Sequence, residues 1–119
     1  MQVIINQAGK IPVVILKGRM DALTSPDVKN QLLGTMNPGL KVLIIDCSLL
    51  EYLSSAGIRV FYQIARAMAD WQGELIFCST TAVVSEIFTM VGMDTDFKIF
   101  QQLDEAVALV NGKNGQADQ

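Results

Sequence analysis

The sequence has 119 residues, of which 50% are hydrophobic and 18% charged, with a net charge of −3 at pH 7. This size suits one domain with its own core, and the composition argues against disorder. No run of Lys or Arg is present, which argues against a nucleic-acid or anionic-membrane surface. The chain also lacks a signal-peptide pattern and any segment near the roughly 18 apolar residues that suggest a membrane span. We therefore expect a cytoplasmic protein.

The residue types exclude several kinds of catalysis. The sequence has no histidine, which excludes Ser-His-Asp and Cys-His catalysis and His-based metal sites. It also has no GxxxxGK[ST] loop and no GxGxxG turn. Cys47 and Cys78 each follow an apolar run and are expected to be buried reduced thiols, although a redox pair stays open if the two strands are neighbours. We expect no cofactor, no metal and no enzymatic activity of the chain's own.

The first part of the chain predicts a hairpin followed by a helix. Two runs rich in Val and Ile, residues 3–6 and 11–17, are typical of strands, and residues 7–10 between them predict a turn. Ser25 stands before a proline, which is a typical helix start with the cap preceding a proline at the first helical position. Apolar residues then recur at helical spacing as far as Met36.

The rest of the chain alternates strands with helices. Strands are predicted over residues 40–45, 74–78 and 97–100, and helices from about residues 54, 81 and 103. This order predicts an α/β fold with a mainly parallel sheet of about five strands, an N-terminal antiparallel hairpin and four helices. We expect residues 1–110 to form one domain and the polar, Gly-rich residues 111–119 to form a flexible tail.

Three predicted loops follow the carboxyl ends of strands, at residues 18–25, 46–55 and 79–81. In open α/β sheets, binding sites tend to form outside these ends. We therefore expect the polar side chains of the three loops to gather at one edge of the sheet. These side chains are Asp21, Thr24, Asp46, Glu51, Ser54, Ser55 and the hydroxyls of residues 79 to 81.

Ser54 and Ser55 open a predicted helix, where free backbone N–H groups and the helix dipole can accommodate a phosphate. The simplest interpretation is that one serine caps the helix, which is worth about 1 kcal/mol and needs no function. Three observations favour a function for these serines beyond helix capping. Gly57 costs about 1 kcal/mol relative to Ala in a helix, and beside Ala56 it leaves an open surface. Arg59 is electrostatically misplaced near a helix N-terminus. No Glu or Gln completes a capping box.

Asp21 and Asp46 each end a predicted strand and have two interpretations. They are ordinary turn formers in the first. In the second, two or three carboxylates lie near a serine hydroxyl, where they orient it, help a partner to engage it, or coordinate Mg²⁺ brought with ATP. They do not by themselves make the serine a nucleophile.

These segments resemble a known family. The stretch VLIIDCSLLEYLSSAGIRVF resembles the signature of STAS domains, specifically of bacterial anti-sigma-factor antagonists, also called anti-anti-sigma factors. The turn at residues 18–21 resembles the family's Gly-x-[Leu/Ile/Met]-Asp turn. Residues 83–100 resemble its third helix and following strand. The resemblance covers about residues 2–110.

The resemblance implies a partner-switching protein that takes part in transcription regulation. In the family, the unphosphorylated antagonist binds a serine-kinase anti-sigma factor and releases the sigma factor. The kinase phosphorylates one serine from ATP, and a PP2C-type phosphatase reverses this. Alignment on Gly57 places the phosphoacceptor at Ser55, with Ser54, which stands where many members have Asp, as the second candidate. We expect a monomer or a weak dimer.

The expected partner-binding surface follows from the same resemblance. It comprises Asp21, Thr24, Asp46, Glu51, Leu53, Ser54, Ala56, Gly57, Ile58, Arg59, Ser79 and Thr80.

Two other functions remain open. One is a STAS docking subunit without a phosphorylation cycle, such as the cytoplasmic component of a lipid-transport ABC complex. The other is a small nucleotide-binding or nucleotide-hydrolysing protein, which the missing phosphate loop and histidine disfavour.

Overall fold

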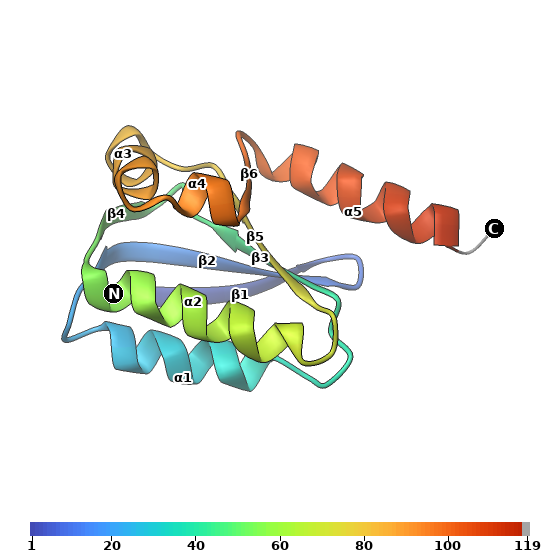
Figure 1. Cartoon of the computed structure of the whole chain (residues 1–119), viewed down its shortest axis with the longest axis horizontal. Coiled ribbons are helices and arrows are strands. Elements are labelled where there is room, and N and C mark those ends of the chain that lie inside the picture. The colour runs from blue at the N-terminus through green and yellow to red at the C-terminus, as the bar shows by residue number, and fades with distance from the viewer. Residues whose placement is uncertain (118–119) are drawn as a thin grey trace.

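The computed structural model describes residues 1–117 and the side chains of residues 1–111. Six strands form one sheet, with helices packed around it (Figure 1). The strands are β1 (Gln2–Ala8), β2 (Ile11–Met20), β3 (Val42–Asp46), β4 (Leu50–Leu53), β5 (Glu74–Cys78) and β6 (Lys98–Phe100). The helices are α1 (Ser25–Thr35), α2 (Ser55–Ala69), α3 (Ala82–Val91), α4 (Met93–Asp96) and α5 (Leu103–Ala117).

The strand order β1-β2-β3-β5-β6 confirms the predicted α/β fold. β1 and β2 form the antiparallel hairpin around a short turn, and the other pairs are parallel. β4 pairs with the far end of β2, beyond the stretch of β2 that pairs with β3. This brings the start of α2 next to the end of β2.

The core has one part on each face of the sheet. On one face, buried side chains of α1, α2 and α3 pack against the strands around Phe77, whose ring meets Phe61 and Phe88 edge-on at centroid distances of 4.9 and 5.1 Å. On the other face, Ala106 and Val110 of α5 pack on buried residues of the central strands. Covering both faces explains why β3 and β5 read as continuous apolar runs.

Two elements, β4 and α4, were not predicted, and β2 is longer than predicted. β4 lies within the predicted loop over residues 46–55, and the end of β2 lies within the predicted loop over residues 18–25. These two segments are strands because they pair with one another, across a register shift next to Gly18. The short helix α4 follows Gly92, which ends α3 in a left-handed conformation at φ 80°.

Two helix boundaries also differ from the prediction. The cap of α1 is Thr24, not Ser25. Ser25 is already helical, and its buried hydroxyl donates a hydrogen bond to the backbone carbonyl of Asp21. Helix α5 continues to Ala117, past the predicted end at Val110. The flexibility of residues 111–119 stays a prediction, and residues 118–119 lie outside the described part.

Cys47 and Cys78 are buried free thiols. Cys78 is the last residue of β5, and Cys47 follows directly after the neighbouring strand β3. The Cys47 N–H donates to the Cys78 carbonyl at 2.9 Å, yet the two side chains pack in the two different parts of the core. Burial raises the pKa of both thiols, to about 11 for Cys78. Since the sheet separates the thiols and protonation keeps them unreactive, they fit the buried-thiol interpretation and not a redox pair.

Across the described residues, no helix combines the length and apolar character that crossing a membrane requires.

Candidate functional site

Ser54 and Ser55 have different structural roles. Ser54 is the N-cap of α2, and its hydroxyl oxygen accepts a hydrogen bond from the Gly57 N–H at 3.4 Å. Its own N–H donates to the Met20 carbonyl at 2.9 Å, which fixes the start of α2 against the end of β2. Ser55 is the exposed first residue of α2, and its hydroxyl has no hydrogen-bond partner within the described residues. The chain therefore uses one serine to start the helix and leaves the next one accessible.

Gly57 faces the core and not the surface. A Cβ at this position would lie 2.6 Å from Cδ1 of Leu53 and 3.0 Å from Cγ of Met20, both of which are buried. Our interpretation of Gly57 as a feature that opens the surface is therefore wrong. The glycine lets the first turn of α2 approach the ends of β2 and β4 closely.

The exposed surface next to Ser55 is formed by three neighbours on α2. Ala56 and Ile58 are half-buried, and Arg59 is exposed one turn after Ser55. Arg59 forms no ion pair with the described residues. Together with Lys29 of α1 it lines a shallow hollow between α1 and α2, so the surface beside Ser55 carries two positive charges.

Asp21 organises the turn that leads from β2 into α1. Its carboxylate Oδ1 accepts hydrogen bonds from the N–H groups of Leu23 and Thr24, both at 3.0 Å. The Thr24 hydroxyl accepts from the Asp21 N–H at 2.9 Å and donates to the Arg19 carbonyl. The Thr24 N–H in particular lowers the pKa of Asp21. Leu23, at the tip of this turn, is 91% exposed.

The structure brings this turn close to the serines but keeps Asp46 apart from them. Asp46 pairs in register with Ile15 of β2, whereas Leu53 pairs with Met20. Five residues of strand therefore separate the two positions, which is about 17 Å at the usual rise per residue. The turn after Asp46 and β4 together cover this distance. The Asp46 carboxylate instead accepts from the Ser48 N–H at 2.9 Å and forms a local turn.

Ser79 and Thr80 lie level with Asp46 and not with the serines, because β5 ends where Cys78 pairs with Asp46. The Ser79 N–H donates to the Phe100 carbonyl, and its φ of 60° is left-handed. Thr81, which follows Thr80, caps α3: its hydroxyl oxygen accepts a hydrogen bond from the Val84 N–H at 3.3 Å. Asp46, Ser79 and Thr80 therefore lie at the carboxyl edge of the sheet, as expected, but not beside the serines.

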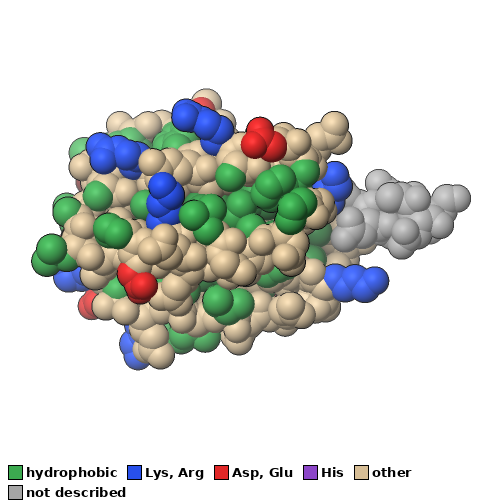
Figure 2. Space-filling model, turned by 90° about the horizontal axis from the view of Figure 1, so that it is seen from below, with side chains coloured by type: hydrophobic (Ala, Val, Ile, Leu, Met, Phe, Trp, Pro, Cys, Tyr) green, Lys and Arg blue, Asp and Glu red, His purple; other side chains and the backbone are tan. Residues whose placement is uncertain are grey.

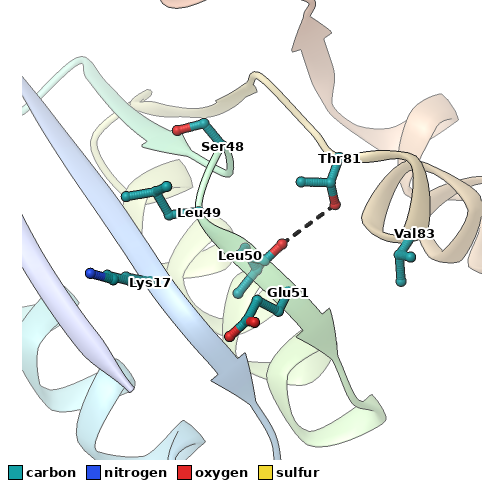
Figure 3. Close-up of a pocket in the computed structure, with 7 residues that line it drawn as sticks. All are labelled: Lys17, Ser48, Leu49, Leu50, Glu51, Thr81 and Val83. Carbon is teal, nitrogen blue, oxygen red and sulfur yellow. Dashed lines mark hydrogen bonds between the residues drawn. The ribbon is translucent and has the colours of Figure 1, made fainter.

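Glu51 lies beside a second hollow, between β2, β4 and the start of α3 (Figure 3). The residues that line it are Lys17, Ser48, Leu49, Leu50, Glu51, Thr81 and Val83. The Thr81 hydroxyl donates to the Leu50 carbonyl across the hollow at 3.4 Å. Leu49 and Val83 are about half exposed, at 47% and 51%. Sequence reasoning missed Lys17, Leu49 and Val83, since the pairing of β4 with β2 and the packing of α3 against β4 bring them together.

This geometry gives Ser55 no activating group of its own among the described residues. Within the described residues no side chain accepts its proton, and no cluster of His, Cys, Asp or Glu is arranged to hold a metal ion. The coordination of Mg²⁺ by gathered carboxylates therefore has no support. A phosphate on Ser55 would instead meet the N-terminal end of the α2 dipole, with Arg59 one turn away.

The chain is similar in sequence to known proteins. Residues 2–106 match the family model of the STAS domain. A protein of Bordetella bronchiseptica, BtrV, which is named as a candidate anti-sigma factor antagonist, is 25% identical over 91% of this chain and 93% of its own length.

Solved structures share the fold. An anti-sigma factor antagonist from Mycobacterium paratuberculosis superposes with a TM-score of 0.83 at 20% identity, over 92% of this chain and 93% of the other. The antagonist SpoIIAA in its unphosphorylated form superposes with a TM-score of 0.79 at 16% identity, over 93% and 97%.

Proposed function

We propose that this chain, which belongs to the STAS domain family, is an anti-sigma-factor antagonist. In this function it is a binding protein and not an enzyme. The names of BtrV and of the Mycobacterium paratuberculosis protein support the proposal, because both are described as antagonists of this kind and match over nearly their whole length. The observation that carries it is the exposed, unbonded hydroxyl of Ser55 next to a serine that already caps the helix.

We further propose that phosphorylation of Ser55 controls this binding. The unphosphorylated chain binds a serine-kinase anti-sigma factor in the cytoplasm and releases a sigma factor. The kinase transfers the γ-phosphoryl group of ATP to the Ser55 oxygen, which loses its proton, and ADP leaves. A PP2C-type phosphatase restores the free hydroxyl by hydrolysis. The chemistry thus belongs to the partners, in agreement with the absence of a base beside Ser55 among the described residues.

The physical effect of the phosphate differs between the free chain and the complex. A phosphate adds about −1.5 to −2 charges at neutral pH. In the free chain it faces solvent, the positive end of α2 and Arg59, so the fold has no reason to change. In an interface over Ala56 and Ile58 it must lose its hydration. A cost of about 3 kcal/mol would lower the affinity more than a hundredfold.

The partner-binding surface is proposed to centre on Ser55. Its nearest members are Asp21, Thr24, Ala56, Ile58 and Arg59, whereas Leu53 and Gly57 are buried and support it from below. Glu51, Asp46, Ser79 and Thr80 lie farther along the same end of the molecule and belong to the surface only if the partner extends to the second hollow.

A pull-down from the source bacterium tests the proposal. The baits are the wild type, Ser55→Ala, Ser55→Asp and, as a matched control, Ser85→Asp at an exposed serine of α3. We expect a serine-kinase anti-sigma factor to be retained by every bait except Ser55→Asp. Equal retention by Ser55→Asp would contradict the charge switch and would favour a docking subunit without a phosphorylation cycle.

A further inference from the structure

The two edges of the sheet are built differently. β1 forms one edge and has seven residues, QVIINQA, with no charged residue and no proline. It pairs with β2 in unbroken register from Gln2 to Ala8, so no bulge interrupts it. Antiparallel pairing on one side leaves every second residue of β1 with its N–H and C=O directed outward. Edge strands of this length are usually protected against pairing with another chain by charged side chains, proline or bulges.

The opposite edge has that protection. β6 is only three residues long. It carries Lys98, whose ammonium group forms an ion pair with Glu74 of β5 at 3.1 Å. Short length and charge are two of the features that prevent edge-to-edge pairing. One edge of the sheet is therefore short and charged, whereas the other, β1, is longer and uncharged. The lack of charge is specific to β1 and is not shared by the whole sheet.

Apolar side chains flank the unprotected edge. Ile5 of β1 is 49% exposed and Leu33 of α1 is 43% exposed. Val3 of β1 and Met36, which follows α1, are half-buried. Figure 2 views the molecule from the side of α1 and shows hydrophobic side chains in a band across this face, which a Lys or Arg side chain interrupts and other charged side chains surround. α1 and β1 are in direct contact, so the strand and the apolar band form one surface.

We propose that β1 pairs antiparallel with β1 of a second copy of this chain, centred on Ile5. A two-fold axis at Ile5 pairs all seven residues, which is the longest overlap that the strand allows. The axis is perpendicular to the sheet and therefore places the two apolar bands side by side on the same face. Because β1 carries no charge, this self-pairing opposes no like charges even though each chain has a net charge of −3.

The test is sedimentation equilibrium of the full chain over about a thousandfold range of concentration. We expect the wild type to rise from its monomer mass of 13.0 kDa towards twice that value. Ile5→Lys should raise the dissociation constant at least tenfold, since it puts two like charges opposite each other at the axis. The matched control is Met90→Lys, which adds the same charge at a 77% exposed side chain on α3 and should behave as wild type.

A cross-linking experiment checks the register. Both native thiols are buried, so a cysteine in place of Ile5 is the only accessible one. Ile5→Cys should form a disulfide-linked dimer under mild oxidation, whereas Met90→Cys should not. A mass of 13.0 kDa at every concentration, or equal weakening by Met90→Lys and Ile5→Lys, would overturn the proposal. None of these changes touches Ser55, so failure here leaves the proposed function unaffected.

Discussion

At the scale of single residues, two adjacent serines with the same side chain have different surroundings because one precedes α2 and the other begins it. Ser54 precedes the helix, with extended backbone, and its hydroxyl oxygen satisfies the Gly57 N–H. Ser55 is helical, so its side chain points to solvent without a bonding partner. The sequence predicts that one of the two serines caps the helix. Which serine is the cap depends on where the helix starts. The hydrogen bond from the Ser54 N–H to the Met20 carbonyl fixes that point, and Met20 is distant from Ser54 in the sequence.

The two serines should therefore differ in their effect on stability. We expect Ser54→Ala to lower the free energy of unfolding by about 1 kcal/mol, as the loss of an N-cap usually does. Ser55→Ala should change it by less than about 0.5 kcal/mol, as an exposed substitution without contacts does. Urea denaturation measures both. Equal losses from the two variants would show that Ser55 also has a structural role.

Asp21 predicts a dependence of stability on pH. The N–H groups of Thr24 and Leu23 lower the pKa of its carboxyl below the ordinary value of 3.8. The charged form therefore stabilises the fold fully above that value, and this contribution is lost as the pH falls through the lowered pKa. We expect the difference in unfolding free energy between wild type and Asp21→Asn to shrink as the pH is lowered from 6 to 2.

Asp27, an exposed acid in the first turn of α1, provides the control for this comparison. Its substitution by Asn tests whether any carboxylate near α1 produces the same pH dependence. A difference between wild type and Asp21→Asn that stays constant from pH 6 to 2 would contradict the role assigned to the Asp21 carboxylate.

At the scale of elements, the prediction of α2 from sequence was right but that of the loop before it was wrong. Serines followed by apolar residues at helical spacing are local signals, and they identify α2. β4 has only four residues and carries the exposed Glu51 between apolar neighbours. It is a strand because β2 continues past Gly18 and offers it a pairing edge. No window of sequence around β4 contains that information.

The contact between α2 and these strands explains Gly57. A methyl group there would meet Leu53 and Met20 at 2.6 and 3.0 Å. We expect Gly57→Ala to destabilise the fold by about 1–2 kcal/mol, because overpacking outweighs the gain in helix propensity of about 1 kcal/mol. Thermal and urea denaturation measure the change.

Gly34 of α1 is the matched control, because a Cβ there would meet nothing within 4 Å. Gly34→Ala should stabilise the chain by about 0.5 kcal/mol through helix propensity alone. If Gly57→Ala stabilised the chain as Gly34→Ala does, the close approach of α2 to β4 would be wrong.

At the scale of the whole molecule, the alternation of strands and helices was enough to predict the parallel sheet and its hairpin. It was not enough to predict which loops meet. Parallel strands place their carboxyl ends on the same side of the sheet, but they do not end at the same level. β2 extends beyond the position opposite Asp46, so the turn of Asp21 lies next to the serines while Asp46 and Ser79 do not.

This arrangement separates one end of the molecule into two surfaces. The first surrounds Ser55, with the Asp21 turn and Arg59 beside it. The second is the hollow lined by Leu49, Glu51 and Val83. We place the proposed switch on the first surface, where one added phosphate changes the charge without disturbing a contact of the fold.

The most direct test of this account uses the purified chain, its serine-kinase anti-sigma factor and ATP. After incubation, tandem mass spectrometry locates the phosphate, and calorimetry compares the affinity of the phosphorylated and unphosphorylated chains for the kinase. We expect a single phosphate on Ser55 and an affinity at least a hundredfold lower, a change of about 3 kcal/mol. A phosphate on Ser54, or a chain phosphorylated on Ser55 that binds as tightly as before, would contradict it.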